Sequence, residues 1–518
     1  MRGWAKTRVT ETLDRGLVAL PCPQGTYLSW RLLKTDPANA AFDVYRQVEG
    51  ARRERLNSLP ITRTTDFLDN TPPAGEPTTY RVRLRGGKAS KTALPGGRAR
   101  ELAYLSIPFS DDFQASKVGV GDLDGDGRYD VVVKHPGHNV WCWNQSGPGR
   151  WERSPDTYKL DAYTTGGKRL WRRDLGWAIE QGLWYSPYLV HDLDGDGRAE
   201  VIVKTGEGDP RNKEGRVVSG AEWVSVWDGR TGKEIARAPW PGREGFGSYD
   251  TLCRHFLAVA YLDSKTPCLL VQRGNYGRVI VDAYQFHKGQ LKKLWRYDNE
   301  SIGSKYWGQG AHTLQVGDLD NDGRDEIVLG GVALDDDGSP MWTVGKGHPD
   351  YVFLGDVDPA RPGWEVFLGH EHRQKTGGNL LVDARTGKTI WGLAVPTNHV
   401  GIDGMCSDID PTSPGLESQA VDVNKEKKPG HCWLWSADGR IMRESDRSIG
   451  GARSAYWDAD LQRELVRSII VPFDGAPLPG RLPGRRGDAG LRQRDPGRAP
   501  AGGRPRLLLQ RARAVHRR

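Results

Sequence analysis

The sequence predicts an all-β protein in which a calcium-stapled β-propeller follows a small N-terminal β-sandwich. Three segments read as an apolar strand, an acid-rich turn and a second apolar strand: Val118–Lys134 (VGVGDLDGDGRYDVVVK), Tyr188–Lys204 (YLVHDLDGDGRAEVIVK) and Leu314–Gly330 (LQVGDLDNDGRDEIVLG). The β-branched residues beside these turns favour strands. The 66 Gly and 19 Trp agree with many short strands and tight turns.

The acids of each turn occupy alternate positions, and a glycine and a further acid follow them. Two carboxylates about 4 Å apart repel by roughly 4 kcal/mol at an effective dielectric of about 20. A cation relieves this repulsion, and hard oxygen ligands suit Ca²⁺; the alternative is a solvated acidic hairpin without an ion. The predicted structural calcium ligands are Asp122, Asp124, Asp126, Asp130, Asp192, Asp194, Asp196, Glu200, Asp318, Asp320, Asp322 and Glu326.

An EF-hand does not fit these turns. Its twelfth position requires Glu, whereas Val133, Val203 and Leu329 stand there, and its flanks should be helical. Two degenerate copies, Asp356–Glu365 and Asp408–Glu417, have Ala and Thr at the third acidic position. We expect these two to form hairpins, with metal binding left open, and a further relic of the repeat at 260–270.

A second kind of hairpin, with a Gly-containing turn, recurs between the acidic ones. One acidic hairpin and one glycine hairpin together make four strands, which is a propeller blade. Residues 104–466 are therefore predicted to form a propeller of seven or eight blades. The glycine hairpins are predicted at Leu160–Arg172, Val226–Arg237, Val281–Arg296, Val382–Gly392 and Leu434–Glu444.

Residues 1–103 read as a separate all-β module that resembles a fibronectin type III sandwich. Strand-like runs lie at 16–21, 26–33, 41–48 and 78–85, separated by Pro, Gly and Asn turns. Trp30, Tyr45 and Tyr80 are candidate core aromatics. Contact with carbohydrate is the alternative role for these rings.

The net charge of +8 comes from the C-terminal tail, so it does not indicate nucleic-acid binding. Residues 471–518 contain 12 Arg and 3 Asp without Lys or Glu, which is +9 and leaves −1 for the rest. We expect the segment 467–518 to be disordered, either as a basic extension or as a GC-rich gene read out of frame. The six Cys are scattered without metal or redox spacing.

No membrane span is expected, because no run reaches about 18 apolar residues. The first residues lack the apolar core of a signal peptide. The sequence is thus expected to be cytoplasmic or to start after an export signal. We expect a monomer.

Counting from the first Asp of each acidic turn locates a second group of polar residues. Six residues earlier, at the far end of the strand, lie His312 and Asp350, and the returning strand ends near Glu371. Together with His348, these side chains could share one cation. Lys134, Lys204 and His370 would lie near the same end of the strands. Hydrogen-bonded structural roles are the alternative.

At these residues the chain resembles the rhamnogalacturonan lyases of polysaccharide lyase family 11. The resemblance extends from Arg15 to Glu464 and includes GQGAHTLQVGDLDNDGRDEIV (Gly308–Val328) and GHPDYVFLGDVDPARPGWEVFLGHE (Gly347–Glu371). It implies an eight-bladed propeller with several Ca²⁺ ions and a fibronectin-like module. The implied substrate is rhamnogalacturonan I, the acidic pectin backbone of alternating rhamnose and galacturonate.

The resemblance also implies an active-site Ca²⁺ on His312, His348, Asp350 and Glu371, and cleavage by β-elimination. Ca²⁺ would neutralise the galacturonate carboxylate while a base removes the C5 proton. Lys204, Lys134 and His370 are the candidates for this base, by position alone. Endolytic and exolytic cleavage both stay open. The substrate class implies an extracellular or periplasmic protein.

Two departures from the family weaken the expected activity. Gly401-Ile402-Asp403-Gly404 stands where the family is expected to have Gly-Arg-Gly, and the tail replaces the expected last blade. We therefore expect an incomplete propeller with weak or no turnover. The alternative function is a non-catalytic calcium-binding propeller for glycan binding or adhesion; a quinone-dependent dehydrogenase has little support.

Overall fold

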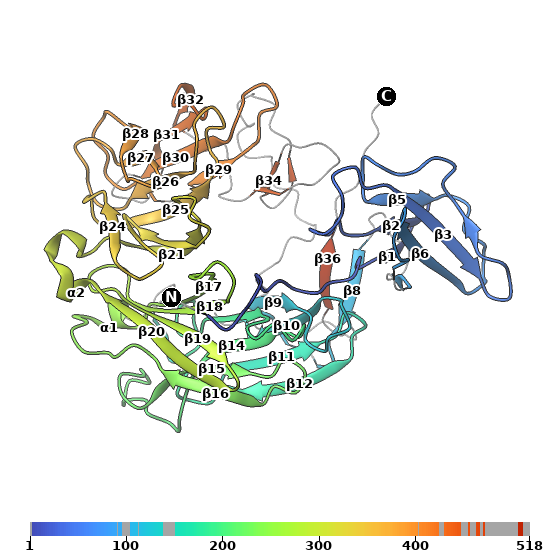
Figure 1. Cartoon of the computed structure of the whole chain (residues 1–518). Coiled ribbons are helices and arrows are strands. Elements are labelled where there is room, and N and C mark those ends of the chain that lie inside the picture. Colours follow the sequence, from blue (N-terminus) through green and yellow to red (C-terminus); the bar gives the residue numbers. More distant parts are fainter. Residues whose placement is uncertain are drawn as a thin grey trace.

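The computed structural model describes residues 3–90, 92–95, 104–111, 113–137, 151–401, 404–423, 429–446, 454–455, 463–466, 470–471 and 506–510. The prediction of an all-β protein is confirmed. Within these ranges the only helices are α1 (Tyr249–Leu252), α2 (Asn299–Ile302) and a 3₁₀ turn at Ser304–Tyr306. Figure 1 shows the N-terminal sheets apart from a longer series of sheets that follow one another along an arc.

The N-terminal strands form two sheets, with the orders β5-β2-β1-β7 and β4-β3-β6. Trp30 and Tyr80 are buried in the core of these sheets, whereas Tyr45 is half-buried with the Arg53 guanidinium over its ring. Core packing thus accounts for two of the three predicted aromatics. The strands are β1 (Val18–Cys22), β2 (Gly25–Ser29), β3 (Phe42–Val48), β4 (Glu54–Arg55), β5 (Asp66–Asp69), β6 (Thr78–Leu84) and β7 (Leu94–Pro95).

Six consecutive four-stranded antiparallel sheets follow, each made of strands in chain order. The relic at 260–270 does form the turn of a hairpin, between β17 and β18. The strands are β9 (Lys117–Gly121), β10 (Asp130–His135), β11 (Lys159–Tyr163), β12 (Arg169–Asp174); β13 (Tyr188–His191), β14 (Glu200–Gly206), β15 (Glu222–Trp227), β16 (Glu234–Pro239); β17 (His255–Ala260), β18 (Cys268–Arg273), β19 (Ile280–His287), β20 (Gln290–Asp298); β21 (Gly310–Gly317), β22 (Glu326–Gly330), β23 (Val332–Leu334), β24 (Pro340–Thr343); β25 (Pro349–Gly355), β26 (Glu365–His370), β27 (Asn379–Asp383), β28 (Thr389–Gly392); β29 (Met405–Ser407), β30 (Glu417–Val423), β31 (Pro429–Trp435) and β32 (Ile441–Ser445). A three-stranded sheet, β33 (Ser454–Ala455), β34 (Glu464–Val466) and β35 (Ile470–Val471), comes last.

Neighbouring sheets meet along their first strands, from β9 through β13, β17 and β21 to β25. Glycine allows this close approach: a Cβ added at Gly119 would lie 2.7 Å from Val190 of the next sheet. The apolar clusters extend across sheet pairs; Val132 and Leu160 pack with Val201 and its neighbours. The core thus lies between the sheets.

Tryptophans on the fourth strands bind neighbouring sheets together. In each case the indole Nε1 donates to a backbone carbonyl in the turn between the third and fourth strands of the next sheet, over 2.7 to 3.0 Å. A glycine of the same turn lies against the indole ring, where a Cβ would clash. The four pairs are Trp171 with Gly229, Trp295 with Asp336, Trp342 with Ala384, and Trp391 with Ala437.

Two terminal segments lie where the sequence did not predict them. Residues 4–14, predicted within the N-terminal module, run along the turns of other sheets: Asp14 N donates to Gly127 O and Val9 N to Lys265 O. In the tail predicted to be disordered, β36 (Arg506–Gln510) pairs antiparallel with β8 (Tyr104–Pro108). Most of 467–518 lies outside the described residues.

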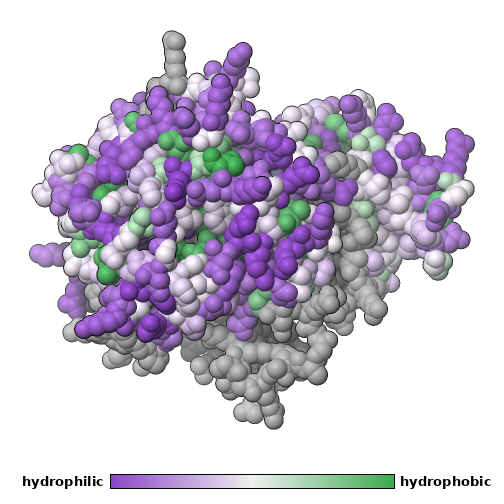
Figure 2. Space-filling view, turned by 90° about the horizontal axis from the view of Figure 1, so that it is seen from below, coloured by the Kyte–Doolittle hydropathy of each residue, from purple (hydrophilic) through white to green (hydrophobic). Residues whose placement is uncertain are grey.

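Figure 2 shows a face dominated by hydrophilic residues, with hydrophobic ones in small scattered groups. None of the helices in the described ranges is long and apolar enough to cross a membrane.

Candidate metal centre

The structure brings His312, His348, Asp350 and Glu371 together at one end of two adjacent sheets. His312 lies in β21 and Asp350 at the start of β25; His348 directly precedes β25, and Glu371 directly follows β26. The Nε2 atoms of His312 and His348 are 3.3 Å apart, and each lies 3.4 Å from Asp350 Oδ1. Glu371 Oε2 lies 3.6 Å from His348 Nε2. The ligand atoms of His312, His348 and Asp350 therefore lie within 4.8 Å of one another, and Glu371 lies beside this triad.

Irregular strand pairing directs these side chains toward one another. Pairing of β21 with β22 shifts register between Gly310 and Gln315, the stretch that contains His312. Pairing of β25 with β26 shifts between Pro349 and Tyr351, so that Asp350 has no partner in the ladder. Such bulges bend a strand and redirect its side chains.

Hydrogen bonding fixes the proton of His348. Its Nδ1 lies 2.5 Å from Gly310 O, and a carbonyl can only accept, so Nδ1 carries the hydrogen. The Nε2 lone pair of the neutral ring then faces the carboxylates of Asp350 and Glu371. Glu371 Oε2 is itself buried and accepts no hydrogen bond within the described part of the chain. Converging acceptors of this kind fit a bound cation.

His399 is a further member of this cluster that sequence reasoning missed. Its Nε2 lies 2.8 Å from Asp350 Oδ2, and Asp350, Glu371 and His399 place ligand atoms within 4.8 Å of one another. Burial raises the pKa of Asp350, but the neighbouring imidazoles of His312, His348 and His399 outweigh burial and hold the pKa far below its usual value. Burial lowers the pKa of His348. His399 lies in a loop before β29, so counting along strands could not find it.

Aromatic rings form a wall behind His312. The Trp184 ring stacks on it at a centroid distance of 5.3 Å, and the Tyr276 hydroxyl lies 3.2 Å from its Nε2. Burial raises the pKa of Tyr276 above its ordinary value, so this hydroxyl stays protonated at neutral pH. The buried Arg254 guanidinium supports both aromatic rings from behind.

The three candidate bases are buried, and none belongs to the cluster. Lys134 Nζ donates to Ser186, and Lys204 Nζ pairs with Glu222 Oε1 at 2.7 Å. The His370 ring is fully buried, and neither nitrogen has a hydrogen-bond partner within the described ranges. Burial lowers the pKa of all three, that of His370 to about 3. The assignment of a base stays a prediction. Ile402 and Asp403 lie outside the described residues.

The acidic turns form three further groups at the opposite ends of the first strands. The first, second and last acids of each turn place oxygens within 4.8 Å of one another: Asp122, Asp124 and Asp130; Asp192, Asp194 and Glu200; Asp318, Asp320 and Glu326. Glu326 Oε2 accepts from Leu319 N, while its buried Oε1 has no partner among the described residues. Burial, with the neighbouring carboxylates adding to it, raises the pKa of Asp130 to about 7, of Glu200 to about 9 and of Glu326 to about 8.

The third acids do not join these groups. Asp196 and Asp322 form ion pairs with Arg198 and Arg324, and Asp126 accepts from the backbone of Arg128. In the degenerate turn at 356–365, Arg361 Nε lies 3.9 Å from Glu365 Oε1, so a guanidinium occupies the neighbourhood of the last acid. In the turn at 408–417, Glu417 Oε1 is buried without a described partner.

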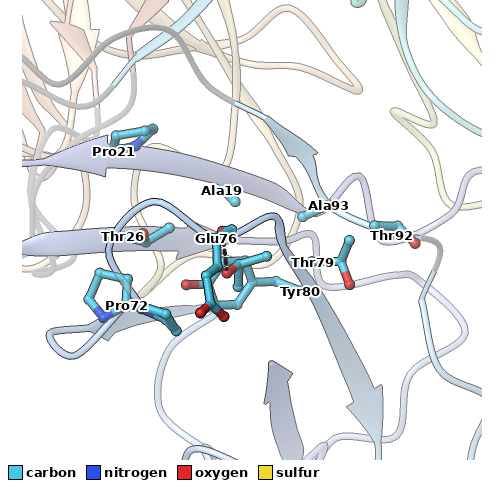
Figure 3. A pocket seen from close by; sticks show the side chains of 11 residues that line it. Ala19, Pro21, Thr26, Pro72, Glu76, Thr79, Tyr80, Thr92 and Ala93 are labelled. Carbon is cyan, nitrogen blue, oxygen red and sulfur yellow. Dashed lines mark hydrogen bonds between the residues drawn. The ribbon is translucent and has the colours of Figure 1, made fainter. Parts of the chain in front are cut away.

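A pocket of about 500 Å³ lies on the N-terminal sheets (Figure 3). Its walls are mainly Pro, Thr and Ala side chains, and Glu76 is the one charged residue among those that line it. The pocket therefore lacks the convergent titratable groups of the metal centre.

Fold and site together define an all-β protein of successive four-stranded sheets with a histidine and carboxylate centre at one end. The family described as "Rhamnogalacturonan lyase family 11, C-terminal domain" matches residues 109–474, and "Rhamnogalacturonan I lyases beta-sheet domain" matches residues 8–93. The chain belongs to rhamnogalacturonan lyase family 11, which confirms the resemblance found in the sequence.

Two relatives come from Bacillus subtilis (strain 168). The chain is 37% identical over 507 residues to rhamnogalacturonan endolyase YesW, covering 89% of this chain and 75% of the relative. It is 36% identical over 502 residues to rhamnogalacturonan exolyase YesX, and this match covers 89% of this chain and 78% of the relative. The crystal structure of the exotype rhamnogalacturonan lyase YesX superposes with a TM-score of 0.79 at 34% identity, over 89% of this chain and 79% of that one.

Proposed function

We propose that this protein is a rhamnogalacturonan lyase that cleaves the rhamnose–galacturonate bond of rhamnogalacturonan I by β-elimination. Membership of the family and the names of its relatives support this substrate class. The observation that carries the proposal is the clustering of His312, His348, Asp350 and Glu371 in two adjoining ligand triads, which share Asp350 and are completed by His399. A non-catalytic glycan-binding propeller would need the acidic turns but not this cluster.

The proposal includes a β-propeller whose blades are the four-stranded sheets. Six sheets with the same strand order, joined along their first strands and through tryptophan hydrogen bonds, support it. The N-terminal sheets would be the fibronectin-like module, with boundaries near 103 and 466 as the sequence predicts.

We propose Ca²⁺ at the centre, on the four predicted ligands and His399. Two ligands about 90° apart and about 2.4 Å from an ion stand about 3.4 Å from each other, near the separations here. A tetrahedral Zn²⁺ with ligands at about 2.1 Å gives nearly the same spacing. Imidazoles suit transition metals and carboxylates suit Ca²⁺; the acidic substrate, which adds a further carboxylate, favours Ca²⁺. We also propose structural Ca²⁺ at the three complete acidic turns.

A bound cation would supply positive charge that stabilises the enolate-like carboxylate formed when the C5 proton leaves. The protein residues orient this centre: Gly310 O holds His348, and Asp350 holds His399. Trp184 and Tyr276 shield one side of His312 from water. The base must reach the sugar, so Lys134, Lys204 or His370 could act only if substrate binding exposed it.

The test is ultraviolet absorbance after incubation with rhamnogalacturonan I, because only elimination produces a conjugated, unsaturated uronate. We expect absorbance to rise with Ca²⁺ and not with EGTA, and Asp350→Asn to abolish the rise. Restoration of an EGTA-treated sample by Zn²⁺ but not Ca²⁺ would change the metal assignment. Because this chain is expected to have weak or no turnover, the decisive sample is a version with the family's last blade restored, and no product from that version with either metal would reject the lyase function. We propose an extracellular or periplasmic monomer, which fractionation and light scattering would test.

A further inference from the structure

A buried asparagine lies directly behind the metal centre. Asn275, in the loop between β18 and β19, is fully buried, and its side-chain Nδ2 lies 3.2 Å from His312 Nδ1. Its Oδ1 is buried and has no hydrogen-bond partner within the described residues. The backbone fixes this position, because a Cβ added at Gly310 of β21 would lie 2.7 Å from Asn275 O.

If His312 binds a metal through Nε2, the Asn275 amide must accept a hydrogen bond from His312 Nδ1. His312 Nε2 is the ring nitrogen that faces Asp350 and His348, so this nitrogen offers the lone pair to a cation. A neutral imidazole carries one hydrogen, which must then be on Nδ1 and requires an acceptor. The Asn275 amide is beside Nδ1, and only its oxygen can accept.

An amide rotated by half a turn places its oxygen where its nitrogen was, because the two ends occupy nearly the same space. The rotated amide would bring Oδ1 to about 3.2 Å from Nδ1. The protonated Tyr276 hydroxyl, 3.2 Å from Nε2, can donate to that nitrogen when no cation is bound. The same orientation of the His312 ring therefore suits both the cation-bound and the cation-free protein.

We propose that Asn275 is a positioning residue whose Oδ1 accepts the Nδ1 hydrogen of His312 and so keeps Nε2 available to the cation. This inference rests on the proposed metal centre. His348 is held in the same way by Gly310 O, a backbone group that substitution does not remove. The side chain of Asn275 can be replaced. Partners that orient metal-binding imidazoles change metal affinity by about 10- to 100-fold.

Three variants of the full chain test the inference. Asn275→Leu removes the acceptor, whereas Asn275→Asp keeps an acceptor and cannot donate. Asn57→Leu is the matched control: Asn57 is a buried asparagine of the N-terminal sheets whose amide binds backbone groups of Phe42 and Val44. It should lower stability without affecting the metal centre.

The first readout is the ring N–H of His312 in calcium-loaded protein labelled with ¹⁵N-histidine, assigned by its absence in His312→Ala. We expect a Nδ1–H resonance protected from solvent exchange in the wild type and in Asn275→Asp. Asn275→Leu should lose this protection. A wild type without a Nδ1–H resonance from His312, or an Asn275→Leu variant that keeps the protected signal, would overturn the role of Asn275.

The second readout is terbium luminescence, with Tb³⁺ as a probe for the cation. The emission that disappears in Trp184→Phe reports on this centre, because Trp184 stacks on His312. Asn275→Leu should weaken Tb³⁺ binding about 10- to 100-fold. Asn275→Asp and Asn57→Leu should bind Tb³⁺ at least as tightly as the wild type. Equal losses in the Leu and Asp variants of Asn275 would refute the acceptor role. No Trp184-dependent emission in the wild type would instead reject the metal centre itself.

Discussion

Replacing Glu222 by glutamine should strongly destabilise the protein, because this carboxylate neutralises three cations in the core. Glu222 Oε1 lies 2.7 Å from Lys204 Nζ, and its Oε2 pairs with Arg243 Nη2 at 3.0 Å and with Arg273 Nη2. The side chains of Glu222, Lys204 and Arg273 are each less than one-tenth exposed. Leaving buried cations without their carboxylate costs about 3–5 kcal/mol.

The same contacts set a pH dependence. Burial raises the pKa of Glu222, but Lys204, Arg273 and Arg243 outweigh burial and lower it from 4.5 to about 2. A carboxylate with a depressed pKa in the folded state stabilises it fully above the unfolded pKa. The stabilisation is lost as pH falls toward the folded pKa. Between pH 4.5 and 2 the wild type should therefore lose about 3 kcal/mol that Glu222→Gln never has.

Urea unfolding followed by tryptophan fluorescence at several pH values measures both effects. The matched control is Glu207→Gln, which removes an exposed pair with Arg237 at 2.7 Å and should cost at most about 1 kcal/mol. If Glu222→Gln unfolded at the same urea concentration as Glu207→Gln at pH 7, the buried cluster would not contribute as its geometry indicates. The same conclusion would follow if the two variants showed parallel pH profiles between pH 4.5 and 2.

Three further predictions concern the calcium turns, the substrate face and the packing between sheets. Ca²⁺ at about 100 times its dissociation constant should stabilise the wild type by about 2.7 kcal/mol per site, and Glu326→Gln should remove one site's share of the Ca²⁺-dependent rise in melting temperature; an undiminished rise would exclude a metal in that turn. Trp307→Ala should raise KM for the polymer about five-fold, the equivalent of about 1 kcal/mol of aromatic contact, because this half-exposed ring packs on Gly277 beside the metal centre. The similarly exposed Trp364, against Gly317 at the acidic-turn end, is its control, and equal KM changes in both alanine variants would reject a substrate contact. Trp342→Phe keeps an aromatic ring but loses the pyrrole part of the indole and its 2.8 Å hydrogen bond to Ala384 O, so thermal unfolding should show a loss of at least about 1 kcal/mol; an unchanged melting temperature would show that this hydrogen bond does not stabilise the packing of these sheets.

The local sequence pattern was sufficient to predict the strands, the turns and part of the metal centre. Alternating acids between β-branched runs specify a strand, a turn and a strand without long-range information, and the hairpins lie where this pattern repeats. A strand also advances by a nearly constant distance per residue. Counting back from Asp318 and Asp356 therefore reached His312 and Asp350, which the structure places 3.4 Å apart.

Other features depend on which sheet lies beside which. Lys204 reads as a polar residue at a strand end, but its burial follows from Glu222 of the next strand and Arg273 of the next sheet. The sequence shows that tryptophan is abundant, but it does not show which backbone carbonyls the indoles bind, because those carbonyls lie in another sheet. No short-range pattern encodes such contacts, because they form only when two sheets pack.

The sequence by itself determined the family, the order of strands and turns, and the groups of acids, since each of these follows from residues close together in the chain. Tertiary structure alone decided that Asn275 lies against His312 and that His399 lies against Asp350. Asn275 and His399 lie in loops without a periodic conformation, and folding brings them to the centre from other sheets. The third acids show the same limit: in two of the turns a nearby arginine pairs with an acid that the pattern assigned to the metal.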